Sequence, residues 1–224
     1  MTVLKSNKPP HEADTHVNTA YDQILLQIVQ GTLPSGTKLK TTELSNQLGL
    51  SRTPVVQALQ RLIADGIVTQ VPQKCSVVAE GAENWLVDTH ELRLLLEPQA
   101  AFYAAERMEP EVLEMLTGYA EAAQPDENPD WIQHAYLFDY YLHTSIARAS
   151  GNLPLCEAIC KCMSFKRLTY GVSKDSPDLL QRDQAEHQMI LDSLRKKEPE
   201  TASAAMRFHL TNSLDFRKPG ENII

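Results

Sequence analysis

The hydropathy pattern predicts a mainly α-helical protein in two parts, a small helical domain that ends in a β-hairpin and then an antiparallel helical bundle. Two observations lead to this prediction. Within the first 80 residues, three short helical patterns precede two β-rich segments; after residue 80 the strand patterns disappear and long helical patterns follow one another. A chain of 224 residues is long enough for two domains of ordinary size.

The first domain should contain three helices and a hairpin. The expected elements, in order, are helices over residues 17–30, 42–48 and 52–64 and strands over residues 67–71 and 76–78. We expect Thr41 and Ser51 to be the N-caps of the second and third helices. Gly31 and Gly49 should end the first and second. This order of elements is that of a winged helix-turn-helix domain, which we place at residues 17–80.

Six helical patterns fill most of the remaining chain, and segments containing Pro, Gly or Asn separate them. They cover about 82–107, 109–123, 129–149, 153–171, 177–196 and 199–214. Helices joined by such short connections pack as antiparallel neighbours around a shared core. We place this helical domain at residues 81–215, with a flexible leader over 1–16 and a tail over 216–224.

The net charge of −8 is unevenly distributed along the chain. Residues 1–80 hold 7 of the 21 Lys and Arg and 6 of the 29 Asp and Glu, so the acidity lies in the second part. A nearly neutral first domain can still bind DNA if its cations share one face. The chain also has no apolar run of the ~20 residues that span a bilayer and no secretory leader, so we expect a cytoplasmic protein.

The turn between the second and third helices suits a DNA-reading role. The segment Gly49–Leu59 reads GLSRTPVVQAL, and the N-terminal end of such a helix enters the major groove. An arginine there can bind a guanine edge or a phosphate, a glutamine one turn later can bind an adenine edge, and free backbone N–H groups hold phosphate oxygens. The candidate DNA contacts are Ser51, Arg52, Thr53, Gln57 and, at the hairpin tip, Lys74. The alternative is a winged helix that binds only protein.

These residues resemble the GntR family of bacterial regulators over some sixty unbroken positions. The matching motifs are Gly31–Gly36, Leu44–Ser45, Leu48–Val55, Ala58–Leu59 and Asp65–Gly66. The resemblance implies a DNA-binding transcription regulator. Three positions depart from the family pattern: Val56 stands where the family usually has Arg, Cys75 where it has Gly, and Thr41 where it has an acidic residue. The missing arginine removes a cation from the reading helix and implies an altered DNA preference.

Four residues of the second domain form a candidate metal site. Asp139 and His143 lie four residues apart on one helix, so their side chains share a face. His187 and His209 lie on two later helices and could complete the site inside the bundle. Imidazole and carboxylate ligands without a thiolate suit Zn, Ni, Mn or Fe. The alternatives are separate core histidines, or the metal centre of a hydrolase to which the winged helix is appended.

Residues 88–213 resemble the FCD effector domain of the FadR-like, or fatty-acid-regulator, branch of the GntR family. The resemblance rests on Glu91–Arg93, Leu96–Pro98, Asp139–His143, Ser150–Asn152, Glu186–His187 and His209–Leu210. It implies that Asp139, His143, His187 and His209 bind a metal that helps to hold a small carboxylate effector.

Two arginines are candidates for binding that carboxylate. Arg93 could form a bidentate pair with it, or could instead form a salt bridge with Glu97 one turn later. Arg167 is the second candidate. The sequence as a whole therefore predicts a homodimer that binds a pseudo-palindromic operator, with an affinity for DNA that changes when the effector binds.

Overall fold

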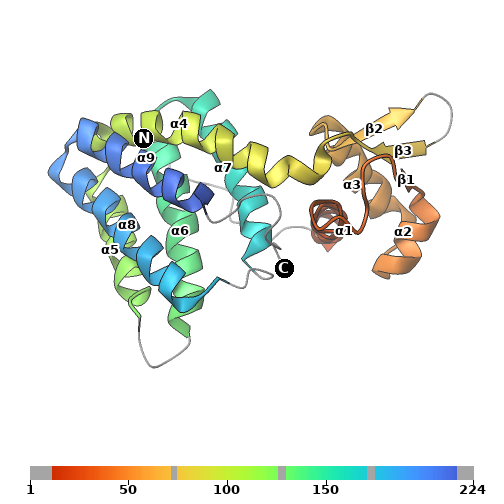
Figure 1. Cartoon of the computed structure of the whole chain (residues 1–224), viewed down its shortest axis with the longest axis horizontal. Coiled ribbons are helices and arrows are strands. Elements are labelled where there is room, and N and C mark those ends of the chain that lie inside the picture. Colours follow the sequence, from red (N-terminus) through yellow and green to blue (C-terminus); the bar gives the residue numbers. More distant parts are fainter. Residues whose placement is uncertain (1–11, 72–74, 126–129, 171–174, 216–224) are drawn as a thin grey trace. The chain divides into compact units, whose positions relative to one another are not determined.

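The computed structural model of the chain describes residues 12–71, 75–125, 130–170 and 175–215 (Figure 1). The chain divides into two compact units, Met1–Trp85 and Leu86–Ile224. Sequence reasoning placed the division after residue 80. The predicted fold class is confirmed, since the described residues form nine α-helices and one small sheet.

The first unit is a winged helix-turn-helix. Its elements are α1 (Glu12–Val29), β1 (Lys38–Leu39), α2 (Thr41–Leu48), α3 (Arg52–Ala64), β2 (Val68–Val71), β3 (Cys75–Val78) and the 3₁₀ helix η1 (Ala82–Asn84). Helix α1 packs against α3 through fully buried apolar side chains, among them Ile24, Ile28, Val55 and Leu62. Gly49 has a left-handed φ of 65° after α2, so its lack of a Cβ permits the sharp turn into α3.

Three details of this unit differ from the sequence-based expectation. Helix α1 begins at Glu12, inside the stretch assigned to a leader. The hydropathy pattern did not reveal this start because Thr15 and His16 are exposed and add no apolar residue to the pattern. The N-cap of α2 is Lys40 and not Thr41, which is already helical. Ser51 is the N-cap of α3, with extended backbone, but its side chain makes no capping hydrogen bond.

The sheet has one strand more than the predicted hairpin. Its order is β1-β3-β2, and both pairs are antiparallel. In β1 only two residues pair, with Lys38 opposite Val77 and Leu39 opposite Ser76. A strand this short shows no alternation of apolar and polar residues, so the sequence pattern could not reveal it.

Over its described residues, the second unit is a bundle of six helices. They are α4 (Trp85–Arg107), α5 (Pro110–Ala122), α6 (Asp130–Ala149), α7 (Leu153–Thr169), α8 (Pro177–Lys196) and α9 (Pro199–Asp215). Helix α6 contacts α5, α7 and α8, and α9 packs along α8 (Figure 1). All six lie within a few residues of the predicted ranges. None of the described helices has the length and apolar character needed to cross a lipid bilayer.

Two of these helices start at a residue whose side chain caps the first turn. Asn152 accepts a hydrogen bond from the backbone N–H of Leu155 at the start of α7, and Ser176 accepts one from Leu179 at the start of α8. The core between the helices is built from apolar side chains that include Leu116, Phe138 and Leu142. This core surrounds a group of buried polar side chains that includes Asp139, His143 and His187.

Candidate metal centre and DNA-reading surface

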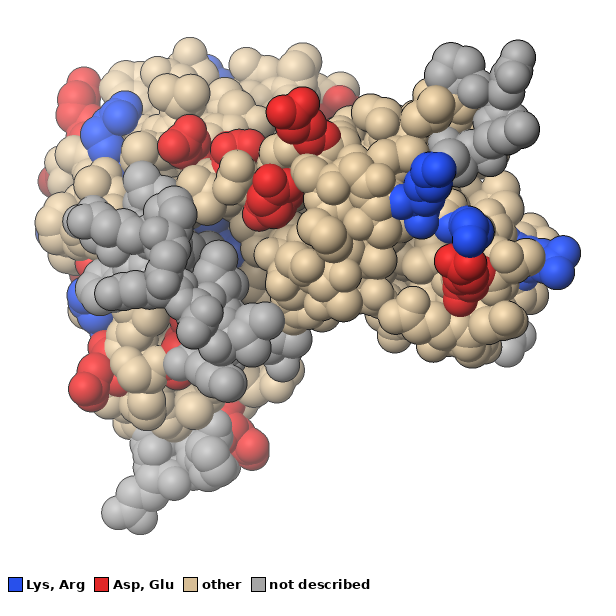
Figure 2. All heavy atoms as spheres, turned by 45° about the vertical axis from the view of Figure 1, so that its right-hand side comes forward, with Lys and Arg blue, Asp and Glu red and all other residues tan. Residues whose placement is uncertain are grey.

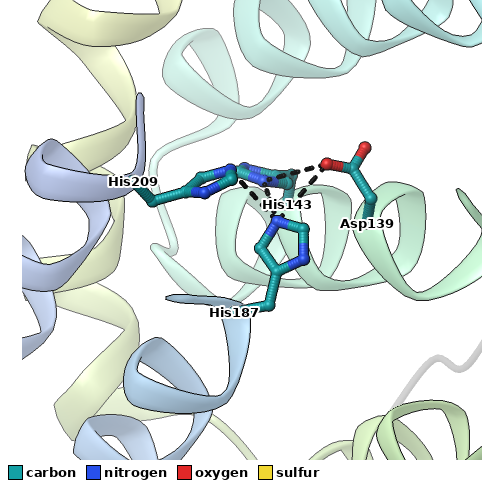
Figure 3. Close-up of side chains that lie close together, drawn as sticks. All are labelled: Asp139, His143, His187 and His209. Atoms are coloured by element: carbon teal, nitrogen blue, oxygen red, sulfur yellow. Dashed lines mark hydrogen bonds and ion pairs between the residues drawn. The ribbon is translucent and has the colours of Figure 1, made fainter. Parts of the chain in front are cut away.

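Four side chains from three helices meet inside the second unit (Figure 3). Asp139 and His143 lie one turn apart on α6, His187 comes from α8, and His209 comes from α9. All four are buried, and His143 and His209 are fully inaccessible. The structure therefore brings together the four residues that the sequence proposed as metal ligands.

Three of the four distances between their inward-facing atoms match those within a metal coordination shell, and the fourth is slightly longer. His187 Nε2 lies 3.0 Å from His209 Nε2 and 3.4 Å from His143 Nε2. Asp139 Oδ1 lies 3.4 Å from His187 Nε2 and 3.7 Å from His143 Nε2. Ligand atoms at ~2.1 Å from a shared ion lie roughly 3.0 to 3.4 Å apart in octahedral and tetrahedral sites. The four residues thus form a group that could hold a metal ion.

The local electrostatics favour the protonation states that metal ligands need. Burial lowers the pKa of His143, although Glu97 beside it acts in the opposite direction. Burial and the two neighbouring histidines hold the pKa of His209 well below its usual value. Burial alone would raise the pKa of Asp139, but Lys166 and the histidines outweigh it and keep that pKa well below the usual range. Neutral imidazoles and an ionised carboxylate are the forms that bind metal.

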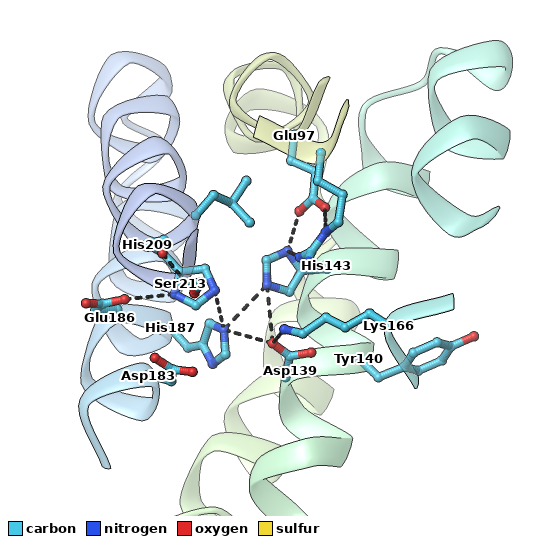
Figure 4. A network of polar contacts seen from close by, with 12 residues as sticks. Glu97, Asp139, Tyr140, His143, Lys166, Asp183, Glu186, His187, His209 and Ser213 are labelled. Atoms are coloured by element: carbon cyan, nitrogen blue, oxygen red, sulfur yellow. Dashed lines mark hydrogen bonds and ion pairs between the residues drawn. The ribbon is translucent and has the colours of Figure 1, made fainter. Parts of the chain in front are cut away.

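Two glutamates fix the orientation of two of these histidines from behind (Figure 4). His143 Nδ1 contacts Glu97 Oε2, and His209 Nδ1 lies 2.9 Å from Glu186 Oε2. Arg93 Nη2 also approaches His143 Nδ1, at 3.1 Å, but the closer contact is with the Glu97 carboxylate. Because an ionised carboxylate only accepts hydrogen bonds, each Nδ1 carries the proton and donates it. Each Nε2 is then left with a lone pair that faces the centre of the group. Sequence reasoning did not assign this role to either glutamate.

Of the two candidate effector arginines, Arg93 is buried and already paired. Its Nε lies 2.5 Å from Glu97 Oε1, which is the salt bridge considered as the alternative role. Burial would raise the pKa of Glu97, but Arg93 and His143 outweigh it and lower that pKa to about 2. Arg167 is exposed and lies over the ring of Tyr140 at 5.6 Å. Neither arginine lines the cavity beside the metal ligands.

That cavity has a volume of about 90 Å³ and is bordered by Asp139 and His187. Its wall also contains Tyr136, Lys166, Tyr170 and Arg182. A single water needs ~10–15 Å³ in the same measure, so the cavity has room for several waters or a small organic ion. The lining carries both signs of charge: Lys166 and Arg182 are its cations, and Asp139, Asp175 and Asp183 are its carboxylates. Lys166 contacts Asp139 and Arg182 contacts Asp183, so the two cations are offset in the absence of a ligand. No spacing in the sequence linked these two cations to the histidines.

The first unit presents the predicted DNA-reading residues on its surface. Ser51, Arg52, Thr53 and Gln57 are all exposed, at or near the start of α3. Lys74 lies outside the described residues. On the face of this unit turned to the viewer in Figure 2, basic side chains lie close together, whereas acidic side chains are prominent on the second unit.

Comparison with known families agrees with this division of the chain. The model of the bacterial regulatory proteins of the GntR family matches residues 16–78. The model of the FCD domain matches residues 88–212, which is more than half of the chain.

The relatives with assigned functions are transcription regulators and not enzymes. The chain is 30% identical over 190 residues to a probable D-xylose utilization operon transcriptional repressor of Paenarthrobacter nicotinovorans, covering 84% of this chain and 83% of that protein. It is 29% identical over 133 residues to the HTH-type transcriptional regulator McbR of Escherichia coli, covering 59% of this chain and 60% of that one. The solved structure of E. coli McbR/YncC shares the fold, with a TM-score of 0.65 and 24% identity over 90% of this chain and 96% of that one. The chain is therefore a transcription regulator of the GntR family whose second unit is an FCD domain.

Proposed function

We propose that this regulator binds a divalent metal ion in the second unit and uses it to hold a small carboxylate effector. The observation that carries the proposal is the buried group Asp139, His143, His187 and His209, which borders a cavity lined in part by Lys166 and Arg182. The donor set of three imidazoles and one carboxylate fits Zn, Ni, Mn or Fe. A bound ion would supply a Lewis acid with open positions for a carboxylate oxygen.

The residues around the cavity would then select the effector. Lys166 and Arg182 would hold the carboxylate, once the ion offsets the negative charge of Asp139, and the rings of Tyr136 and Tyr170 stack with centroids 4.8 Å apart in the same lining. The small volume favours a short organic acid over a long-chain one. Arg93 and Arg167, the arginines first considered for this role, would act on such a ligand only through other residues or after rearrangement.

For the DNA, we propose that α3 enters the major groove with its N-terminal end first. Arg52 would contact a base edge or a phosphate, Ser51 and Thr53 would hold phosphate oxygens, and Gln57 would reach a second base. The side chain of Ser51 makes no capping hydrogen bond, so the first backbone N–H groups of α3 are available for a phosphate. Lys74 would contact the DNA from the hairpin.

A homodimer would present two such helices to the two halves of a pseudo-palindromic operator, roughly 34–36 Å apart. An effector changes operator affinity only through its unequal affinity for the DNA-bound and free arrangements of the dimer. Coupling of this kind is typically ~1–3 kcal/mol, or about 5- to 150-fold in affinity.

One experiment tests both halves of the proposal. A thermal-shift screen of short organic acids, with and without Zn²⁺, Ni²⁺ and Mn²⁺, should find an acid that raises the melting temperature of metal-loaded protein more than that of chelator-treated protein. The same acid should change binding to DNA from the promoter of the chain's own gene, measured by fluorescence anisotropy. Equal thermal shifts with and without metal would contradict metal-assisted binding.

The DNA contacts have a separate test. Arg52→Ala should abolish specific binding in the same anisotropy assay and leave the melting temperature and oligomeric state unchanged. Gln23→Ala, at an exposed position on α1, is the control and should bind like the unaltered chain. Unchanged affinity in Arg52→Ala would remove this residue from the interface.

A further inference from the structure

Lys166 occupies the one carboxylate oxygen that the metal group also needs. The side chain comes from α7 and is only 11% exposed, and its Nζ lies 2.5 Å from Asp139 Oδ1 (Figure 4). The same oxygen is the one that lies 3.4 Å from His187 Nε2 and 3.7 Å from His143 Nε2. The ammonium group and a metal ion would therefore share one oxygen atom as a ligand.

The other oxygen of Asp139 is already engaged. Tyr170 donates its hydroxyl to Asp139 Oδ2. Oδ2 therefore faces Tyr170, whereas Oδ1 faces the nitrogens of His143 and His187. Within the described part of the chain, Oδ1 is the oxygen that both cations approach.

Two cations on one buried oxygen repel each other strongly. Ions bound to the same oxygen lie only a few ångströms apart, and the burial of the site leaves little water to screen them. The ammonium is the movable partner, since it stands on a flexible four-carbon stem, whereas two of the three imidazoles are held from behind by glutamates. Lys166 also lines the cavity, so a direction in which it can turn is present.

We infer that Lys166 couples the metal to the effector: it neutralises Asp139 when no ion is bound, and it turns to the effector carboxylate when an ion takes Asp139 Oδ1. The inference rests on the proposed function. Its consequence is cooperativity, because an anion in the cavity stabilises the displaced ammonium and thereby favours metal binding. Linkage requires that the metal favours anion binding by the same factor.

Whether neutralising Lys166 strengthens or weakens Zn²⁺ binding tests this role. Lys166→Met removes the charge and keeps the length of the side chain, so the variant should bind Zn²⁺ more tightly than the unaltered chain, by about tenfold or more. Affinity is measured by competition with a chromogenic chelator on the full-length protein, without any effector. Lys166→Gln, which keeps a polar group beside Asp139, gives the same test should the methionine variant fail to fold. Lys161→Met, at an exposed position on the same helix, should bind like the unaltered chain.

A second measurement addresses the anion. Acetate, the simplest carboxylate, should raise the Zn²⁺ affinity of the unaltered chain and of Lys166→Arg by a larger factor than that of Lys166→Met or Lys166→Gln, in which it gains only its bond to the ion. Weaker Zn²⁺ binding by both neutral variants would mean that Lys166 supports the ligand Asp139 and does not compete for it, and would overturn the inference. Unchanged Zn²⁺ binding by both would overturn it as well.

A failure of the proposed function gives a different result from a failure of the role of Lys166. If the unaltered chain does not bind Zn²⁺, Ni²⁺ or Mn²⁺, both the metal site and the role of Lys166 are wrong. If the unaltered chain binds an ion and the neutral variants show no tighter binding, only the role of Lys166 is wrong.

Discussion

His209 donates a hydrogen bond from Nδ1 to Glu186 Oε2 over 2.9 Å, while its Nε2 lies 3.0 Å from Nε2 of His187. The glutamate is itself held, because Asn212 donates to its other oxygen at 2.6 Å. The ring of His209 therefore has one orientation and one tautomer, with its lone pair toward the proposed metal position. Partners of this kind fix the ring and raise the basicity of a metal-binding histidine.

Glu186→Gln should weaken metal binding by about 10- to 100-fold. The amide lacks the negative charge that makes His209 a better ligand, and it cannot accept from both His209 and Asn212 with its two terminal atoms. Chelator competition with Zn²⁺ measures the effect, and Glu200→Gln, an exposed glutamate on α9, is the matched control. Equal affinities in the two variants would show that Glu186 does not support the ligand.

His187→Ala should lower the amount of metal that copurifies with the protein. This residue contributes the ligand atom at the middle of the group, within 3.4 Å of the other two imidazoles and of the Asp139 carboxylate. The measurement is metal per chain by elemental analysis. His134→Ala is the control, since His134 lies on α6 outside the group and should leave the metal content unchanged. Full metal content in His187→Ala would exclude this histidine from the site.

Val56→Arg should strengthen DNA binding. The position is 41% exposed on the same face of α3 as Arg52, so a longer side chain fits without disturbing the core. When the logarithm of the affinity is plotted against the logarithm of the salt concentration, one added phosphate contact makes the slope steeper by about 1. Gln23→Arg adds the same charge to the same unit at an exposed position on α1 and should leave the slope nearly unchanged. A slope that does not change in Val56→Arg would mean that this position does not face the DNA backbone.

The sequence predicted those parts of the structure that depend on local patterns. The limits of α8 were predicted correctly because Ser176 and Pro177 start it and the helical pattern stops before the left-handed Lys197. The pair Asp139 and His143 could be found because an i,i+4 spacing puts both side chains on one face of a helix.

The contacts between helices could not be predicted in the same way. Lys166 and Glu97 belong to α7 and α4, and nothing in the spacing of either helix shows that its polar side chain points toward α6. Arg93 illustrates the same limit. Its position in the sequence was compatible with a contact to the effector and with a salt bridge to Glu97, and only the packed structure shows that the salt bridge forms. The polar surroundings of the site depend on tertiary structure and therefore require the coordinates.

Tyr21→Phe should make the first unit less stable near neutral pH and less sensitive to alkaline pH. Tyr21 on α1 donates to Asp65 Oδ2 at 2.5 Å, just after the end of α3, and Arg61 lies 4.7 Å from the centre of its ring. Burial, together with the Asp65 carboxylate, raises the pKa of this hydroxyl far above its usual value near 10. The fold therefore stabilises the protonated hydroxyl. That stabilisation is fully present below about pH 10, where an unfolded tyrosine is protonated too, and it declines as the pH rises further.

Removing the hydroxyl should cost about 1.5–3 kcal/mol of stability at pH 7, the usual contribution of a hydrogen bond to a charged group. Urea unfolding at pH 7 and at pH 10.5 measures both effects. The difference in stability between Tyr21→Phe and the unaltered chain should be smaller at the higher pH, because the unaltered chain then loses the contribution that the variant never had. Tyr103→Phe, a half-buried tyrosine of the second unit, should show no such narrowing. A difference for Tyr21→Phe that stays constant or grows with pH would mean that folding does not raise the pKa of Tyr21.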